Sequence, residues 1–151
     1  GCLAQMVEVF SRTGCSILGT ERVPPENTGS YGIVDTDGEG QLVEVRGIVE
    51  KPKPEEAPSN RGVVGRYVHT SEIFHQLSQT GHGTGGEIQL TDGIARLMDK
   101  EKVMAYSFEG RRYDCGSKIG YLQANVDYAL KHDQLGPEFE AWITNRFNLT
   151  S

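Results

Sequence analysis

The sequence predicts a fold of the α/β class, because segments with helical and with strand-like periodicity alternate along its 151 residues. Near the N-terminus, apolar residues recur at helical spacing and a strand-like run follows directly, an order typical of half a β-α-β unit. Two later strand-like runs flank a turn-rich segment, which predicts a β-hairpin. We therefore expect a mixed sheet with helices packed against it.

The first third of the chain contains a predicted helix and three predicted strands. The helix ends at Gly14, a typical C-cap, and the first strand of its β-α-β unit is expected to be absent from the chain. The next strand spans residues 16–23 and stops at two prolines, because proline has no N–H for a sheet ladder. Strands at 31–35 and 42–49 are joined by the turn residues 37–40.

The rest of the chain alternates two further strands with helices. A polar loop at 54–60 precedes a strand at 62–68, and another strand is predicted at 103–108. Four helices are expected: one with Ile73, Phe74 and Leu77 after an N-cap at Ser71; one with Ile94, Leu97 and Met98 after an N-cap at Thr91 or Asp92; one running to about Lys131; and one with Phe139, Trp142, Ile143 and Phe147 after Pro137. No linker divides the chain, so residues 1–151 are expected to form a single domain.

Composition narrows the classes of function. With 36% hydrophobic and 24% charged residues the chain is typical of a globular protein, and no apolar run approaches the roughly 20 residues of a membrane span. A net charge of −6 argues against a nucleic-acid surface, but it is compatible with a local phosphate site. No secretory signal is visible, and Cys2, Cys15 and Cys115 are expected to be reduced thiols of a cytoplasmic protein.

Residues 47–53, Gly-Ile-Val-Glu-Lys-Pro-Lys, place an acidic and a basic side chain next to each other at the end of a predicted strand. Glu50 and Lys51 should diverge, because successive strand residues point to opposite faces. Glu50 could hydrogen-bond a polyhydroxyl ligand while Lys51 holds a phosphate as a point charge. The alternative interpretation is a solvated pair of charges before a turn.

Four other positions are candidates for a site. Asp114 precedes a predicted helix, where a carboxylate either caps the helix or binds magnesium together with substrate phosphates. Lys118 is either a surface lysine or a phosphate contact. Gly32 and Gly65 lie within predicted strands, where glycine often marks the close approach of a ligand to the backbone.

Two other patterns are less informative. The glycine-rich segment Gly81–Gly86 lacks the Gly-Lys-Ser/Thr ending and the leading strand of a phosphate loop, so a mobile connection is the preferred interpretation. The four histidines have no metal-ligand spacing and are expected to be structural or surface residues: His69, His75, His82 and His132.

Taken together, five segments resemble the bacterial UTP–glucose-1-phosphate uridylyltransferase family. In order they are Tyr31-Gly-Ile-Val-Asp35, Val49-Glu-Lys-Pro52, Val64-Gly-Arg-Tyr-Val68, Gly86-Glu-Ile-Gln-Leu-Thr-Asp92 and Arg112-Tyr-Asp-Cys-Gly-Ser-Lys-Ile-Gly-Tyr121. The resemblance covers nearly the whole chain. It implies a Rossmann-like nucleotide-diphospho-sugar transferase fold with an incomplete mixed sheet. It also implies a transferase that makes UDP-glucose and pyrophosphate from UTP and glucose 1-phosphate, with magnesium.

The resemblance also implies roles for individual residues. Glu50 would hydrogen-bond the glucose hydroxyls, and Lys51 would hold the sugar phosphate. The backbone of Gly32 would approach the sugar, and Gly65 could do the same. Asp114 would be one of two magnesium ligands.

The resemblance also has implications for the partners of the protein and for how much of the family's sequence this chain contains. Lys118 would lie near the phosphates, and the full-length protein would be a homo-oligomer. The family's glycine-rich nucleotide loop and its second metal-binding aspartate are not found in the sequence. The chain therefore corresponds to the C-terminal, sugar-binding half of the family, and we expect it not to catalyse the reaction alone.

Two alternatives stay open at this stage. The chain could belong to a nucleotidyltransferase for another sugar phosphate or nucleotide, because base selection lies in the other half of the family. It could also be a non-catalytic interaction module that assembles through its last helices. Trp142 and Phe147 on the last helix are expected to be core residues, which argues against this second alternative.

Overall fold

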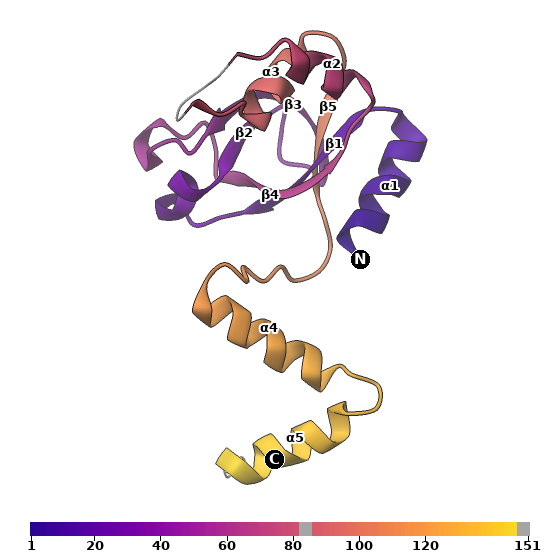
Figure 1. Cartoon of the computed structure of the whole chain (residues 1–151), viewed down its shortest axis with the longest axis vertical. Helices are drawn as coiled ribbons and strands as arrows, with labels where there is room; N and C mark the ends of the chain where they lie inside the picture. Colours follow the sequence, from indigo (N-terminus) through magenta and orange to yellow (C-terminus); the bar gives the residue numbers. More distant parts are fainter. Residues whose placement is uncertain (82–85, 148–151) are drawn as a thin grey trace. The chain divides into compact units, whose positions relative to one another are not determined.

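The computed structural model describes residues 1–81 and 86–147, and the chain divides into two compact units at Gly110 and Arg111 (Figure 1). Residues 82–85, most of the glycine-rich segment predicted to be a mobile connection, lie outside the described residues. The expectation of one domain over residues 1–151 stays a prediction.

The N-terminal unit contains five strands and three α-helices. In chain order they are α1 (Cys2–Thr13), β1 (Ser16–Arg22), β2 (Gly32–Thr36), β3 (Leu42–Glu50), β4 (Arg61–Val68), α2 (Glu72–Ser78), α3 (Leu90–Met98) and β5 (Val103–Ser107). Short 3-10 helices at Pro25–Ser30 and Pro54–Glu56 follow β1 and β3. The C-terminal unit contains α4 (Lys118–Leu130) and α5 (Gly136–Phe147). Every predicted strand is present within two residues of its predicted ends.

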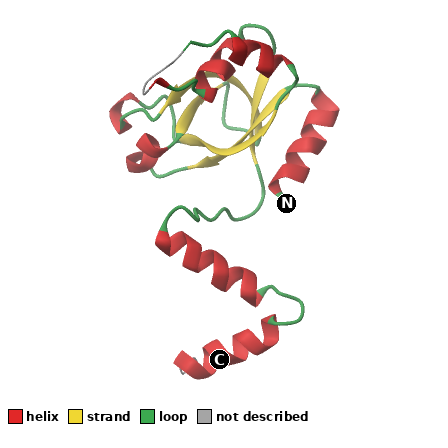
Figure 2. Cartoon of the chain, in the orientation of Figure 1, coloured by secondary structure: helices red, strands yellow, loops and turns green. Residues whose placement is uncertain are grey.

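The five strands form a closed sheet in the order β1-β4-β2-β3-β5, with β5 pairing back to β1 (Figure 2). The β1–β5 pair is parallel and the other four pairs are antiparallel. The predicted α/β class, with a mixed sheet and flanking helices, is confirmed. The predicted hairpin is β2–β3, with Gly32 opposite Glu50. Closure of the sheet was not predicted, because it depends on pairings between distant segments.

Two hydrophobic clusters hold the N-terminal unit together. One cluster fills the barrel and the space under α2 and α3; its buried members are Leu18, Val34, Val43, Val45, Val63, Ile73, Ile94, Leu97, Val103 and Ala105. The other lies between α1 and the outside of the barrel, with Met6, Val9, Ile17 and Tyr106. Ile17 and Leu18 are both fully buried on opposite faces of β1, because α1 covers one face of this strand and the barrel interior the other.

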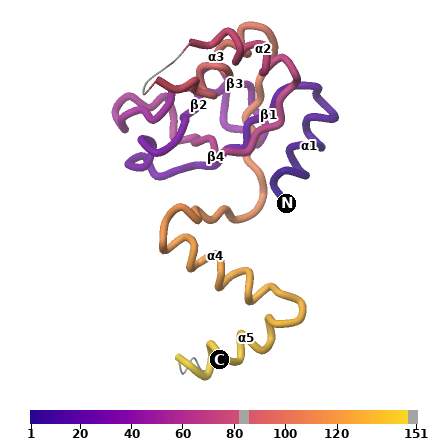
Figure 3. Tube along the Cα trace, viewed as in Figure 1, coloured from indigo at the N-terminus to yellow at the C-terminus, as the bar shows by residue number. Residues whose placement is uncertain are grey.

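The strand directions divide the barrel into two ends (Figure 3). Strands β1, β2 and β5 run one way, and β3 and β4 run the other way. What we call the Glu50 end holds the ends of β3 and β4 and the starts of the other three strands. The Arg61 end holds the starts of β3 and β4 and the ends of the other three. Every second residue of a strand points into the barrel, so each inward-facing row continues from the apolar interior toward both ends.

The helix boundaries correct several details of the sequence prediction. Gly14 ends α1 with φ 67°, as its C-cap role requires. Ser71 is the N-cap of α2, as predicted, although its side chain forms no cap bond; Phe74 is 74% exposed instead of facing the core. Helix α3 follows Gln89, so neither Thr91 nor Asp92 is its N-cap. The helix begins early because Leu90 already packs against the core of the barrel.

The C-terminal unit is a pair of helices with much exposed apolar surface. Trp142 and Phe147 are 57% and 62% exposed, so the expectation that they are core residues is wrong for this unit. Trp142 instead stacks on Phe139, with ring centroids 5.8 Å apart. Two helices alone cannot enclose every apolar side chain on both of their faces.

Two global expectations can be compared with the structure. Residues 1–81 and 86–147 contain no helix that is long and apolar enough to cross a membrane. Cys2, Cys15 and Cys115 are free thiols, as predicted.

Candidate functional site

The Glu50 end brings three of the predicted site residues together. Gly32 and Glu50 are directly opposite each other on β2 and β3. They occupy the positions that follow the inward-facing Val34 and Ile48 toward this end of the barrel. A side chain at Gly32 would therefore lie beside the Glu50 carboxylate. The alternation of a buried strand thus brings a carboxylate to the rim of an apolar interior.

The space beside Gly32 is bounded by two side chains. A Cβ atom added at Gly32 would lie 3.3 Å from Glu50 Oε2 and 3.3 Å from Thr91 Cγ2, which is closer than most real contacts of a Cβ atom. The absence of a side chain at position 32 therefore lets the Glu50 carboxylate and the Thr91 methyl lie close to the β2 backbone. This observation fits the prediction that a ligand approaches the backbone there.

Thr91 is a residue of this end that the sequence analysis did not select. Its hydroxyl is buried and has no hydrogen-bond partner within the described residues. Leaving a buried hydroxyl unpaired costs roughly 1–3 kcal/mol, so such groups often mark the place of a ligand or a water. The signal for Thr91 was its place in the Gly86–Asp92 motif of the resemblance, where it was interpreted as a helix cap.

Lys51 has an unusual backbone conformation. Its φ of 46° is the one positive φ of a non-glycine residue within the described parts of the chain. Lysine in the left-handed region is strained, and such strain is concentrated at functional sites. The Lys51 N–H donates to Tyr31 O at 3.0 Å, which holds the turn against β2. The ammonium Nζ lies 3.6 Å from Glu50 Oε1, so the expectation that the two side chains diverge is wrong: strand alternation ends where Lys51 enters the turn.

The side chains of Glu50 and Lys51 differ in charge and in exposure. The Lys51 side chain is 64% exposed, whereas that of Glu50 is 34% exposed. The solvated-pair interpretation accounts for their proximity, but it does not account for the strained backbone of Lys51. Burial, followed by the charge of Glu50, raises the pKa of Tyr67, which places this tyrosine near the same carboxylate.

Gly65 has an explanation of its own. It has φ 68° in β4, where the pairing with β1 shifts register between Leu18 and Thr20. A β-bulge with glycine in the left-handed region is a common way to make such a shift. Nothing lies within 4 Å of a Cβ atom built at Gly65. The predicted approach of Gly65 to a sugar stays a prediction.

Asp114 and Lys118 belong to the C-terminal unit, where the turn before α4 is tightly bonded. Ser117 is the N-cap of α4, and its hydroxyl accepts from the Gly120 N–H at 3.0 Å. The capping interpretation of Asp114 is therefore wrong, because Ser117 has that role. Asp114 Oδ1 instead accepts from the Gly116 N–H at 3.1 Å, and Lys118 is exposed as the first residue of the helix. The magnesium role of Asp114 and the phosphate contact of Lys118 stay predictions.

The donor set was also compared with what magnesium requires. Among the described residues, no group of three or more His, Cys, Asp or Glu side chains could hold a metal ion. Magnesium commonly takes only one or two protein carboxylates and completes its shell with water and substrate phosphates. A single exposed carboxylate such as Asp114, fixed by one bond to its own turn, fits that requirement.

The Glu50 end thus combines an acceptor carboxylate, a hydroxyl without a partner among the described residues, a glycine backbone and a lysine. A carboxylate and a hydroxyl suit the hydroxyls of a sugar, and an ammonium suits a phosphate. This chemistry agrees with a comparison of the chain with known families. Residues 2–131 match the nucleotidyl transferase family, and the chain belongs to it.

Individual relatives within this family share one enzyme name. The chain is 46% identical over 147 residues to the UTP–glucose-1-phosphate uridylyltransferase of Haemophilus influenzae, covering 95% of this chain and 50% of that protein. It is 44% identical over 151 residues to the enzyme of the same name from Escherichia coli, covering 97% and 49%. The chain therefore spans about half the length of the curated relatives that it matches.

Two solved structures similar to this chain are of enzymes with the same activity in their names. A UDP-glucose pyrophosphorylase complexed with UDP-glucose superposes with a TM-score of 0.80 at 40% identity, covering 87% of this chain and 50% of that one. A UTP-bound enzyme from Acinetobacter baumannii gives 0.82 at 41% identity, covering 93% and 48%. The resemblance on which the fold prediction rests is therefore confirmed.

Proposed function

We propose that this chain supplies the sugar-phosphate-binding portion of a UTP–glucose-1-phosphate uridylyltransferase. The observation that carries the proposal is the juxtaposition of Gly32, Glu50 and Lys51 at one end of the barrel. The names of the relatives support the choice of UTP and glucose 1-phosphate as substrates. The half-length match supports the further proposal that the nucleotide is bound by another portion of such an enzyme.

In this proposal the three residues divide the recognition of glucose 1-phosphate. The Glu50 carboxylate accepts hydrogen bonds from sugar hydroxyls, and the missing side chain of Gly32 lets the sugar lie against β2. The Thr91 hydroxyl gains the partner that it lacks in the described residues. The Lys51 ammonium lies at the mouth of the site, where it neutralises charge on the sugar phosphate.

The reaction requires little covalent chemistry from the protein. A phosphate oxygen of glucose 1-phosphate attacks the α-phosphorus of UTP, and the bond between that phosphorus and the β-phosphate oxygen breaks to release pyrophosphate. Positioning and charge neutralisation account for catalysis of this kind. Lys51 lowers the repulsion between the attacking phosphate and UTP, and for this reason we assign it a catalytic role.

We also propose that Asp114 contributes one carboxylate to a magnesium site and that Lys118 contacts a phosphate. Magnesium would supply charge neutralisation on the triphosphate when bound. The exposure of both side chains at the tightly bonded start of α4 supports these assignments. We further propose that the full-length enzyme is a homo-oligomer. We also propose a cytoplasmic location, which the free thiols of Cys2, Cys15 and Cys115 support.

Binding of glucose 1-phosphate to this chain, measured by isothermal titration calorimetry, tests the proposed function. We expect Glu50→Gln and Lys51→Gln each to weaken binding by about tenfold or more, because each removes a charged hydrogen-bond partner. Lys53→Gln and Glu55→Gln are matched controls, since both residues are exposed a few positions away. Equal effects of the four substitutions would contradict the assignment.

An assay of UDP-glucose formation from UTP, glucose 1-phosphate and Mg²⁺ tests the division of labour. We expect the 151-residue chain to bind the sugar phosphate without forming UDP-glucose. Turnover by the chain alone would contradict this proposal. A second candidate, a related transferase with another nucleotide, predicts equal binding of glucose 1-phosphate and differs only in the nucleotide that the full-length enzyme accepts.

A further inference from the structure

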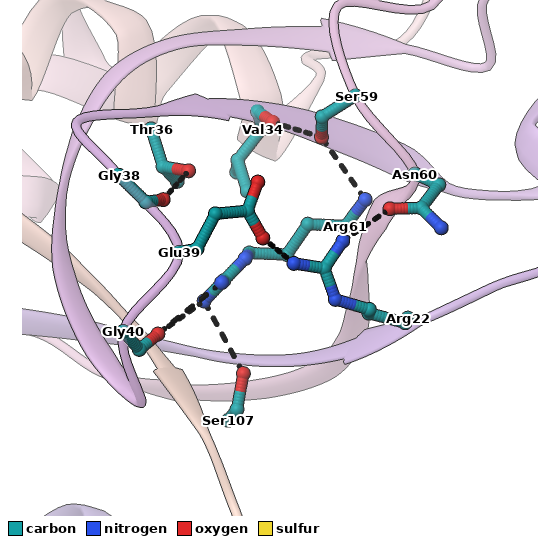
Figure 4. A network of polar contacts seen from close by, with 10 residues as sticks. All are labelled: Arg22, Val34, Thr36, Gly38, Glu39, Gly40, Ser59, Asn60, Arg61 and Ser107. Carbon is teal, nitrogen blue, oxygen red and sulfur yellow. Dashed lines mark hydrogen bonds and ion pairs between the residues drawn. The ribbon is translucent and has the colours of Figure 1, made fainter.

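The Arg61 end of the barrel contains a cavity on the opposite side from the proposed sugar site. Its volume is about 370 Å³, within the range of roughly 300–1,000 Å³ that is typical of small-molecule sites. The cavity is lined by residues from the ends of β1 and β5 and the starts of β3 and β4: Thr20, Glu21, Arg22, Glu39, Gly40, Gln41, Arg61, Ser107, Phe108 and Gly110. Figure 4 shows the polar network of this end.

Strand alternation explains why polar groups point into the cavity. Thr20 is two residues beyond Leu18 on β1, Arg61 is two residues before Val63 on β4, and Ser107 is two residues beyond Ala105 on β5. All three apolar residues belong to the barrel core, so the polar ones continue the same inward-facing rows: Leu18, Val63 and Ala105. The apolar interior thus ends in a layer of polar side chains.

Arg61 is a buried cation bonded to neutral groups. It is 3% exposed, and its Nη1 donates to Gly40 O and to Ser107 Oγ, both at 3.2 Å. Its Nη2 also donates to Gly40 O at 3.2 Å. These bonds leave the Nε–H and one Nη2–H of the guanidinium for another acceptor. Burial, followed by the charge of Arg22, lowers the pKa of Arg61, so its surroundings disfavour the cation on balance.

Thr20 provides a second, independent observation. It is 1% exposed, lines the same cavity, and its hydroxyl has no hydrogen-bond partner among the described residues. A hydroxyl can donate to an anionic oxygen at the same time as a guanidinium does. The acidic Glu39 of the cavity lining is paired with Arg22, whose Nη1 also donates to Asn60 Oδ1 at 2.7 Å. These side chains are largely exposed, which places them at the mouth of the cavity.

We propose that this cavity binds a small oxyanion, a phosphate or a carboxylate group, between the Arg61 guanidinium and the Thr20 hydroxyl. The anion would compensate the buried cation and satisfy the buried hydroxyl at once. Charged hydrogen bonds from guanidinium to either kind of oxyanion are favourable and can be bidentate. This site is separate from the proposed sugar site, because the two lie at opposite ends of β3 and β4.

Nuclear magnetic resonance of the ¹⁵N-labelled chain, titrated with inorganic phosphate at constant ionic strength, tests the proposal. We expect shifts of the Gly40, Gln41 and Ser107 amide signals as phosphate rises to about 20 mM, above the roughly 1 mM dissociation constant that a few charged bonds support. Acetate in place of phosphate distinguishes the two sources: shifts with acetate as well identify a carboxylate-compatible site. No shift with either anion would overturn the proposal.

Thr20→Val is the decisive variant, because it removes the hydroxyl and keeps the shape of the side chain. We expect phosphate binding to weaken about tenfold while the melting temperature without phosphate stays the same or rises, since no bond of the described structure is lost. Unchanged binding in Thr20→Val would overturn the site. Arg61→Lys, which retains the charge but not the planar fork, should also weaken binding.

Two controls separate this site from other effects. Thr28 is a buried threonine whose hydroxyl donates to Pro25 O at 2.9 Å, so Thr28→Val should lower the melting temperature without changing phosphate binding at the cavity. Lys51→Gln removes the proposed phosphate contact at the Glu50 end. The shifts at Gly40 and Ser107 should persist in this variant, and their loss would overturn the claim of a separate site.

Discussion

Gly32 and Glu50 face each other across the β2–β3 hairpin, and a methyl group on Gly32 would come within 3.3 Å of Glu50 Oε2. The glycine therefore lets the Glu50 carboxylate lie close to the β2 backbone. Its φ is not in the left-handed region, so backbone conformation does not explain why position 32 is a glycine. Space beside the carboxylate is the remaining physical reason.

Gly32→Ala is predicted to separate binding from stability. The added methyl should fill the space proposed for the sugar and weaken glucose 1-phosphate binding at least tenfold, as measured by calorimetry. The free energy of unfolding should change by no more than about 1 kcal/mol, because a flexible carboxylate can move aside. Gly47→Ala on β3 is the control, since its Cβ would meet Asp35 Cβ at an ordinary 3.7 Å. A Gly32→Ala chain with unchanged binding would contradict the proposed site.

Two substitutions of Lys51 are predicted to differ in stability while both lose phosphate binding. Asparagine tolerates the left-handed region, so Lys51→Asn should unfold within about 0.5 kcal/mol of the original chain. A β-branched residue does not tolerate φ 46°, so Lys51→Ile should lower the free energy of unfolding by about 1–2 kcal/mol. Urea denaturation measures this difference. Equal stabilities would show that the strain at Lys51 is energetically unimportant.

His69 is predicted to make stability depend on pH. Its ring stacks on Tyr67 at 5.6 Å, and both ring nitrogens are buried without a partner in the described part of the chain. Burial lowers the pKa of His69, and the charge of Glu101 opposes this only in part. The unfolded chain takes up a proton near pH 6.5 while the folded chain resists it, so this stabilisation is complete above that pH and is lost as pH falls toward the folded pKa.

Thermal unfolding at pH 7.5 and pH 5.5 measures the effect. The difference between the two melting temperatures should shrink in His69→Phe, which keeps the ring stacking and removes the titrating nitrogens. His75→Gln is the control, because His75 is exposed and its substitution should leave the difference unchanged. An undiminished pH dependence in His69→Phe would assign the effect to other groups.

Features that depend on neighbouring residues could be predicted from the sequence, whereas features that depend on contacts between distant residues could not. The strand that ends at Glu50, Lys51 and Pro52 was predictable, because apolar runs and proline act locally. The closing of the barrel was not, since it depends on the pairing of β1 with β5 about 85 residues away. Arg61 was missed for a related reason: a charged residue beside a strand is usually solvated, and only closure buries it.

The candidate site shows the same division. Glu50, Lys51 and Gly32 were selected from local patterns and the resemblance, and the hairpin brings them together. Thr91 lies about 40 residues beyond them, and only the packing of α3 on the barrel places it beside Gly32. Capping was one of two interpretations of Asp114, because Asp and Ser have similar preferences at helix starts, and the backbone geometry makes Ser117 the N-cap.

Gly120→Ala is predicted to destabilise α4, although the same substitution usually stabilises a helix by about 1 kcal/mol. A Cβ at position 120 would overlap the backbone oxygen of Asp114 and lie 2.7 Å from Ser117 Oγ. The turn that holds Asp114 would have to move, breaking the cap bond from the Gly120 N–H to Ser117 Oγ. We expect a loss of about 1–3 kcal/mol in local stability. Hydrogen exchange of the α4 amides measures it, with Gln123→Ala on the exposed face of α4 as the control. Slower exchange in Gly120→Ala than in the original chain would show that the turn does not pack on the helix as described, and the proposed placement of Asp114 for magnesium would lose its structural support.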